Sequence, residues 1–177
     1  LSEIHAKQIA HTTIVDSRAL LPYHQGHFGA GKPVFIPYGT DSTAPQQSDA
    51  RTLEKFDLTP NNYLLQVCRL EPENNPDWVI GEYLESNVQI PLVIAGDSPY
   101  ASALVRNLKR TNPRVRLVGR VSGDDYLHLL RNSRLYIHGH EIGGTNPSLL
   151  EAIGAGRPTL ALDVAFNREV LDHSGEF

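Results

Sequence analysis

Short apolar runs recur at regular intervals along the second two thirds of the chain, and segments of helical character separate them. Residues 63–68 are apolar at almost every position, which is typical of a parallel strand buried on both faces. The pattern predicts strands at residues 63–68, 92–95, 115–118, 135–137 and 158–161, with helices at 76–86, 100–110, 122–132 and 146–155 and from about 168. This alternation predicts βαβ units, and hence an α/β fold with a Rossmann-like parallel sheet and helices on both faces.

The first third of the chain is less regular. Here the sequence predicts the tail of a helix at residues 1–10, strands at 12–15 and 34–37, a helix at 17–24 before a glycine-rich loop, and a polar loop at 38–49. Ser122 with Asp125 three positions later resembles a capping box, which would begin the helix at 122–132.

Composition restricts the classes of function. The 177 residues suffice for one domain with a full core, and the net charge of −4 excludes a broad basic surface for nucleic acid. Cys68 is the single cysteine, so no intrachain disulfide forms, which favours the cytoplasm. No apolar run approaches the roughly 20 residues of a transmembrane helix. The chain lacks methionine and begins at Leu1, which favours an excised domain of a longer protein over simple trimming.

The loop that follows the strand at 135–137 has the richest chemistry. Gly143 and Gly144 allow a ligand to approach the backbone, and Thr145 or Asn146 can cap the next helix. The free amides of the first helical turn form an anion site. Glu151 lies one turn further along and suits a ribose diol beside a diphosphate. The alternative is a plain glycine loop with a glutamate on a solvated helix face.

Two other loops also follow predicted strands. The first loop contains Arg69, which could bind phosphate oxygens in two places or could form a salt bridge to Glu71 or Glu73. The second loop could contact a flat base through its backbone, with an arginine stacked over the base, or it could be a simple strand-to-helix turn. Its residues are Gly119, Arg120 and Val121.

His138, His140 and Glu141 raise the possibility of a metal site. No third strong ligand lies nearby in the sequence, and no Asp-x-Asp pair occurs, so we expect no metal. His140 is better suited to donate a hydrogen bond to a transferred sugar or to a phosphate oxygen. The sequence contains neither a Walker-type loop nor a nucleophile elbow.

Taken in order, several stretches resemble the carboxyl-terminal domain of retaining glycosyltransferases of family 4, which have the two-domain GT-B fold. The stretches are residues 36–41, 69–75, 93–97, 117–121 and 143–158. The sequence of residues 138–152 is similar to that of a subgroup of rhamnosyltransferases that build bacterial surface polysaccharides.

The resemblance implies a role for each matching position. Gly119, Arg120 and Val121 would line the base, and Glu151 would hold the ribose. The family usually has a lysine at the position of Asn74 and a glutamate at the position of Gly143. Glu141 and His140 are therefore the candidates for contact with the donor sugar. The implied diphosphate contacts are Arg69, Asn74, Gly143, Gly144, Thr145 and Asn146.

The resemblance also implies that two segments of the chain have different roles. Residues 1–35 would form the end of an acceptor domain and a hinge, and residues 36–177 would bind a UDP-, dTDP- or GDP-linked sugar without a cofactor. We expect the longer protein to transfer a sugar, rhamnose being the candidate, to a glycan or lipid-linked acceptor. Its expected location is cytoplasmic, with membrane association left open. The alternatives are a nucleotide-sugar 2-epimerase and a non-catalytic nucleotide-sugar or partner-binding module.

Overall fold

A computed structural model describes residues 10–27, 33–40, 50–98 and 112–177. The predictions for residues 1–9, for the glycine-rich loop at 28–32, for most of the polar loop and for the helix at 100–110 fall outside these ranges. The strands are β1 (Ile14–Val15), β2 (Val34–Phe35), β3 (Leu64–Val67), β4 (Leu92–Ala95), β5 (Val115–Gly119), β6 (Leu135–His138) and β7 (Thr159–Ala161). The helices are η1 (Arg18–Leu20), α2 (Leu21–His27), α3 (Ala50–Lys55), η2 (Pro72–Asn74), α4 (Pro76–Glu85), α6 (Gly123–Asn132), α7 (Pro147–Gly154) and α8 (Ala165–Leu171).

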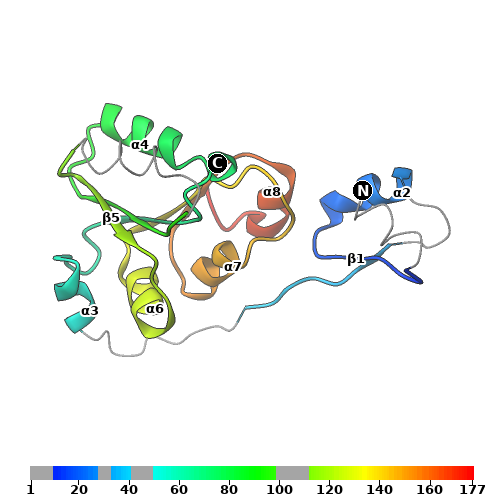
Figure 1. Cartoon of the computed structure of the whole chain (residues 1–177), viewed down its shortest axis with the longest axis horizontal. Coiled ribbons are helices and arrows are strands. Elements are labelled where there is room, and N and C mark those ends of the chain that lie inside the picture. Colours follow the sequence, from blue (N-terminus) through cyan, green and yellow to red (C-terminus); the bar gives the residue numbers. More distant parts are fainter. Residues whose placement is uncertain (1–9, 28–32, 41–49, 99–111) are drawn as a thin grey trace.

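The main sheet is parallel and has the strand order β5-β4-β3-β6-β7. The chain moves outward from β3 to β5, then returns to the other side of β3 and continues through β6 to β7. Helices α6, α7 and α8 cover one face of the sheet, and α4 lies on the other (Figure 1). The predicted α/β fold with a doubly covered parallel sheet is thereby confirmed.

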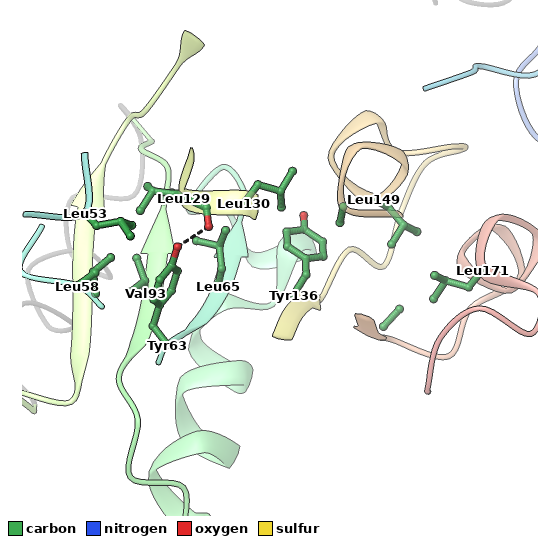
Figure 2. Packing of buried hydrophobic residues seen from close by; sticks show 13 residues of the cluster. Leu53, Leu58, Tyr63, Leu65, Val93, Leu129, Leu130, Tyr136, Leu149 and Leu171 are labelled. Atoms are coloured by element: carbon green, nitrogen blue, oxygen red, sulfur yellow. Dashed lines mark hydrogen bonds between the residues drawn. The ribbon is translucent and has the colours of Figure 1, made fainter. Parts of the chain in front are cut away.

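Each face of the sheet has its own hydrophobic core, because successive side chains of a strand point to opposite faces. On the face of α6 and α7, Leu65 and Tyr136 pack with Leu129 and Leu149 (Figure 2). Tyr63 belongs to the same cluster, and its hydroxyl donates to the carbonyl of Leu129. On the other face, α4 packs on the alternate strand positions. The buried members of that cluster are Leu64, Cys68, Leu70, Val79, Ile80, Tyr83, Leu92, Ile94 and Val115.

The capping box expected at the start of α6 is wrong. Ser122 is the N-cap residue, but its side chain makes no capping hydrogen bond. Asp125 instead accepts from Thr52 Oγ1 at 2.8 Å and from Lys55 Nζ at 2.8 Å. Both partners lie on α3, which the sequence pattern did not predict. The short helix α3 forms because it packs on α6, and Asp125 binds α3 instead of completing a capping box.

The amino-terminal elements form a separate small unit. Strands β1 and β2 pair in parallel, and η1 and α2 follow β1 (Figure 1). This unit touches the main domain mainly where η1 meets α8. The last helix, α8, begins at Ala165 and not near Arg168 as the sequence suggested.

Candidate functional site

The strand order reverses between β3 and β6, so the crevice beyond their carboxyl ends is where an open α/β sheet binds ligands. The loops that leave these two strands are joined directly. The amide of Glu141 donates to the carbonyl of Glu73 at 2.9 Å, and Asn75 Nδ2 donates to the carbonyl of Gly139 at 2.9 Å. A Cβ atom at Gly139 would lie 2.7 Å from the carbonyl oxygen of Asn74. This close approach explains why residue 139 is a glycine. It also places the loop that contains Arg69 beside the loop that leads from β6 to α7.

Helix α7 begins at the switch point with a well-formed cap. Asn146 Oδ1 accepts from the amide of Ser148 at 3.0 Å, which identifies Asn146, not Thr145, as the capping residue. Gly143 has a φ of 129°, a value that side chains disfavour, so the glycine is required for the loop to reach the helix. Ser148 Oγ also accepts from the buried Tyr136 hydroxyl at 2.9 Å. The first turn is thus fixed to β6 before any ligand arrives.

Glu151 is half-buried and accepts a hydrogen bond from the hydroxyl of Tyr126 on α6. It therefore does not lie on a plain solvated face. Burial, and secondarily this hydrogen bond, raise the pKa of Tyr126, which keeps the phenol protonated as a donor. A pocket of about 320 Å³ adjoins the carboxylate, and its lining residues are Tyr38, Gly39, Thr40, Leu127, Pro147, Leu150, Glu151 and Ala155.

Arg69 stands at the end of β3, and its side chain is 70% exposed. Its guanidinium lies 2.9 Å from Glu71 Oε2 and 3.8 Å from Glu73 Oε1, so the salt bridge considered as an alternative does form. Asn74 is buried, and its amide donates to the carbonyl of Arg69 at 2.7 Å. The structure therefore gives Asn74 a part in shaping the loop and does not present it to solvent as a phosphate ligand.

Two imidazoles stack beneath the crevice. The rings of His138 and His140 are 4.3 Å apart and nearly parallel. Desolvation, and then the charge of His140, lower the pKa of His138 to about 3; desolvation and Arg69 lower the pKa of His140 to about 4. Both rings are therefore neutral at pH 7. Within the described ranges, no group of three or more His, Cys, Asp or Glu side chains could hold a metal ion.

The loops after β4 and β5 lie at the same edge of the sheet, beyond the carboxyl ends of the strands. The amide of Gly96 donates to the carbonyl of Gly119 at 2.8 Å, and a Cβ atom at Gly96 would lie 1.7 Å from the carbonyl oxygen of Cys68. Gly119 has a φ of 73°, and Arg120 beyond it is exposed. The three residues expected to line the base therefore lie on the edge that also carries Arg69.

A second cavity lies away from this edge, on the face of the sheet that α4 covers. It is an apolar groove of about 510 Å³ between α4 and β7, with Trp78, Tyr83, Leu160 and Phe177 among its lining residues. Most of its lining side chains are apolar, and its acidic residues Glu82 and Asp163 would repel a phosphate. The groove is therefore a poor candidate for the same ligand.

An open parallel sheet with a glycine loop and a capped helix at its switch point is the architecture of a Rossmann-type domain. The model of the family described as "Glycosyl transferases group 1" matches residues 61–176. The chain belongs to this family. Among the helices of the described ranges, none is long and apolar enough to cross a membrane.

Relatives of the chain are glycosyltransferases. The O-antigen chain mannosyltransferase B of Escherichia coli is 24% identical over 130 residues, covering 70% of this chain and 34% of the relative. Among solved structures, Anabaena HepE in complex with UDP-glucose superposes with a TM-score of 0.78 at 19% identity, covering 93% of this chain and 48% of that one. Sucrose-phosphate synthase of Thermosynechococcus elongatus superposes with a TM-score of 0.75 at 19% identity, covering 98% and 46%. These likenesses show a GT-B-like fold, and the chain spans half or less of each protein.

Sequence reasoning missed two residues that the fold brings to the site. Tyr126 holds Glu151 from 25 positions away, and Asp16 lies against Gly144. No local pattern marks either residue, since both contacts depend on how distant elements pack.

Proposed function

We propose that the chain is the donor-binding domain of a family 4 retaining glycosyltransferase that uses a nucleoside-diphosphate sugar. The observation that supports this most is the direct joining of the Arg69 loop and the α7 loop at the switch point. The complex of HepE with UDP-glucose favours a uridine-linked donor. The name of the Escherichia coli relative favours a surface-polysaccharide acceptor. The resemblance of the sequence of residues 138–152 to rhamnosyltransferases favours rhamnose as the transferred sugar.

In this proposal, the first-turn amides of α7 and the Arg69 guanidinium stabilise the leaving diphosphate as its bond to the sugar breaks. Arg69 must then exchange Glu71 and Glu73 for phosphate oxygens. The Arg69 side chain is 70% exposed, and ion pairs in contact with solvent are worth about 0–1 kcal/mol, so the exchange costs little. No protein nucleophile is assigned.

Glu151 would accept hydrogen bonds from the two ribose hydroxyls, because an ionised carboxylate only accepts. Tyr126 fixes its orientation and leaves acceptor positions free. The backbone of Gly119 and Val121 would then read the base, with Arg120 over its face. His140 and Glu141 would lie nearer the sugar, at the loop that follows β6.

A non-catalytic binding module is the second candidate, and one observation favours it. Asn74 is buried where the resemblance implies a lysine, so the loop lacks that positive charge. The relatives favour a transferase over an epimerase, because they are named as transferases.

Isothermal titration of the chain with UDP, dTDP and GDP tests the proposal. We expect one of them to bind, and Arg69→Ala and Glu151→Ala each to weaken binding by about 1–3 kcal/mol, the range for a charged hydrogen bond. Arg134→Ala and Glu85→Ala are matched controls, because both side chains are exposed and lie at the opposite, amino-terminal edge of the sheet. Unchanged affinity in both site variants would overturn the site. Binding of none of the three diphosphates would overturn the function.

A further inference from the structure

The amino-terminal unit reaches the proposed donor site at one point. Thr145 Oγ1 donates to the carbonyl of Asp16 at 2.7 Å, so the hydroxyl next to the α7 cap is engaged by the segment after β1. The side chain of Asp16 lies directly against Gly144. A Cβ atom at Gly144 would be 2.2 Å from Asp16 Oδ1 and 2.9 Å from its Cγ. The carboxylate can occupy this place only because residue 144 has no side chain.

A second contact holds the segment in position. Glu169 of α8 accepts three hydrogen bonds, from Ser17 Oγ at 2.6 Å, from the amide of Arg18 at 2.9 Å and from the amide of Ala19 at 3.2 Å. Ser17 is fully buried by this contact. The carboxylate of Glu169 thus supports the cap that Ser17 provides for η1, and it fixes the backbone directly after Asp16.

The carboxylate of Asp16 itself has no hydrogen bond or ion pair within the part of the chain that the structure describes, although the residue is half-buried. Such a group accepts hydrogen bonds and donates none. It cannot be a phosphate ligand, because two negative groups in contact repel each other. In a nucleoside-diphosphate sugar, the donors that lie directly beyond the diphosphate are the hydroxyl groups of the sugar, and a carboxylate can accept from them.

We propose that Asp16 binds a hydroxyl group of the sugar carried by the donor nucleotide. The proposal rests on the proposed function, since it needs the diphosphate at the start of α7. It assigns recognition of the sugar in part to the amino-terminal unit, while the main domain recognises the nucleotide. Asp16 would then be a specificity-determining residue contributed from across the crevice.

The test compares a nucleoside diphosphate with its own sugar conjugate, by isothermal titration of the 177-residue chain. The probes are UDP with UDP-glucose, dTDP with dTDP-rhamnose and GDP with GDP-mannose, and the pair that binds most tightly is used. Asp16→Asn should weaken binding of the sugar conjugate about tenfold, as expected for loss of a charged hydrogen bond, and leave binding of the diphosphate unchanged. Asp172→Asn is the control, because it removes the same charge from an exposed side chain at the far end of α8.

Gly144→Ala provides an independent variant, because its methyl group must displace the Asp16 carboxylate. It should lower the affinity for the sugar conjugate relative to the affinity for the diphosphate, and combining it with Asp16→Asn should lower this ratio no further.

Three outcomes would overturn the assignment of Asp16 while leaving the proposed function in place. They are unchanged affinity of Asp16→Asn for the sugar conjugate, equal loss for diphosphate and conjugate, and tighter binding of both. The second would indicate a purely structural role, and the third would show that Asp16 competes with phosphate for the α7 amides. Failure of the wild-type chain to bind any of the three pairs would overturn both proposals.

Discussion

The partners of the charged and polar side chains at the crevice are set by the fold, whether these partners lie near or far along the chain. The sequence identified Arg69 and Glu151 because each has a fixed place relative to a strand or a helix start. It left open whether Arg69 is paired, and the fold shows that Glu71 pairs with it. It also could not show that Tyr126 holds Glu151. Local spacing determines where a side chain is attached, and packing determines what it touches.

The buried His138 makes stability depend on pH. Its pKa is lowered to about 3, against about 6.5 in an unfolded chain. Between these values the unfolded chain binds more protons, so the free energy of unfolding falls as pH decreases. We expect His138 to account for a loss of about 2 kcal/mol between pH 7 and pH 5, with His140 adding in the same direction.

Urea denaturation at the two pH values measures this loss. His138→Phe should reduce the pH dependence, since phenylalanine does not titrate. His173→Gln is the control, because the His173 side chain is 97% exposed. An identical pH dependence in His138→Phe and in the wild-type chain would contradict the prediction.

At the scale of elements, the strands that coincide with continuous apolar runs were predicted to within about two residues. A fully buried strand has no polar face to obscure its pattern, which explains this success. The short helix α3 was missed because six residues are too few to show a helical period. Helix α8 was placed too late in the chain, since its first residues are partly apolar and continue from the loop after β7.

The contact of α8 with η1 makes docking of the amino-terminal segment sensitive to Glu169. Burial acts to raise the pKa of Glu169, but the hydrogen bonds from Ser17, Arg18 and Ala19 outweigh it and lower the pKa. The contact is therefore complete above the pKa of an unfolded glutamate, about 4.3, and is lost as pH falls through the lower pKa of the folded state.

Hydrogen exchange monitors this contact directly. Glu169→Gln should increase exchange of the amides of Arg18 and Ala19 at pH 7, because a neutral amide accepts hydrogen bonds less strongly than a carboxylate. Glu85→Gln on the exposed end of α4 should have no such effect. Equal protection of the two amides in Glu169→Gln and in the wild-type chain would show that the carboxylate does not hold the segment.

For the whole molecule, the main question is how much of the reaction the chain supports. The chain spans 48% of HepE and 34% of the Escherichia coli relative. Sugar transfer requires an acceptor as well as a donor, and the proposed function of this chain covers donor binding alone. We therefore expect the 177-residue chain to bind the nucleotide but to transfer no sugar.

Thermal unfolding and product analysis test the two parts of this expectation separately. A diphosphate at 100 times its Kd should stabilise the chain by about 2.7 kcal/mol, which appears as a rise in Tm. Mass spectrometry of the same mixture with sugar nucleotide and a glycan acceptor should detect no extended product. Robust transfer by the chain alone would contradict the prediction.

The sequence by itself determined the parallel α/β class and the loops that could bind a nucleotide. These properties follow from hydrophobic periodicity and from glycine, proline and capping residues, all of which act over a few positions. The tertiary structure alone decided that Asn74 is buried, that Tyr126 supports Glu151 and that Asp16 rests on Gly144. Each of these contacts joins segments that are separate in the chain, and only the packing of the whole sheet and its helices sets the distances between them.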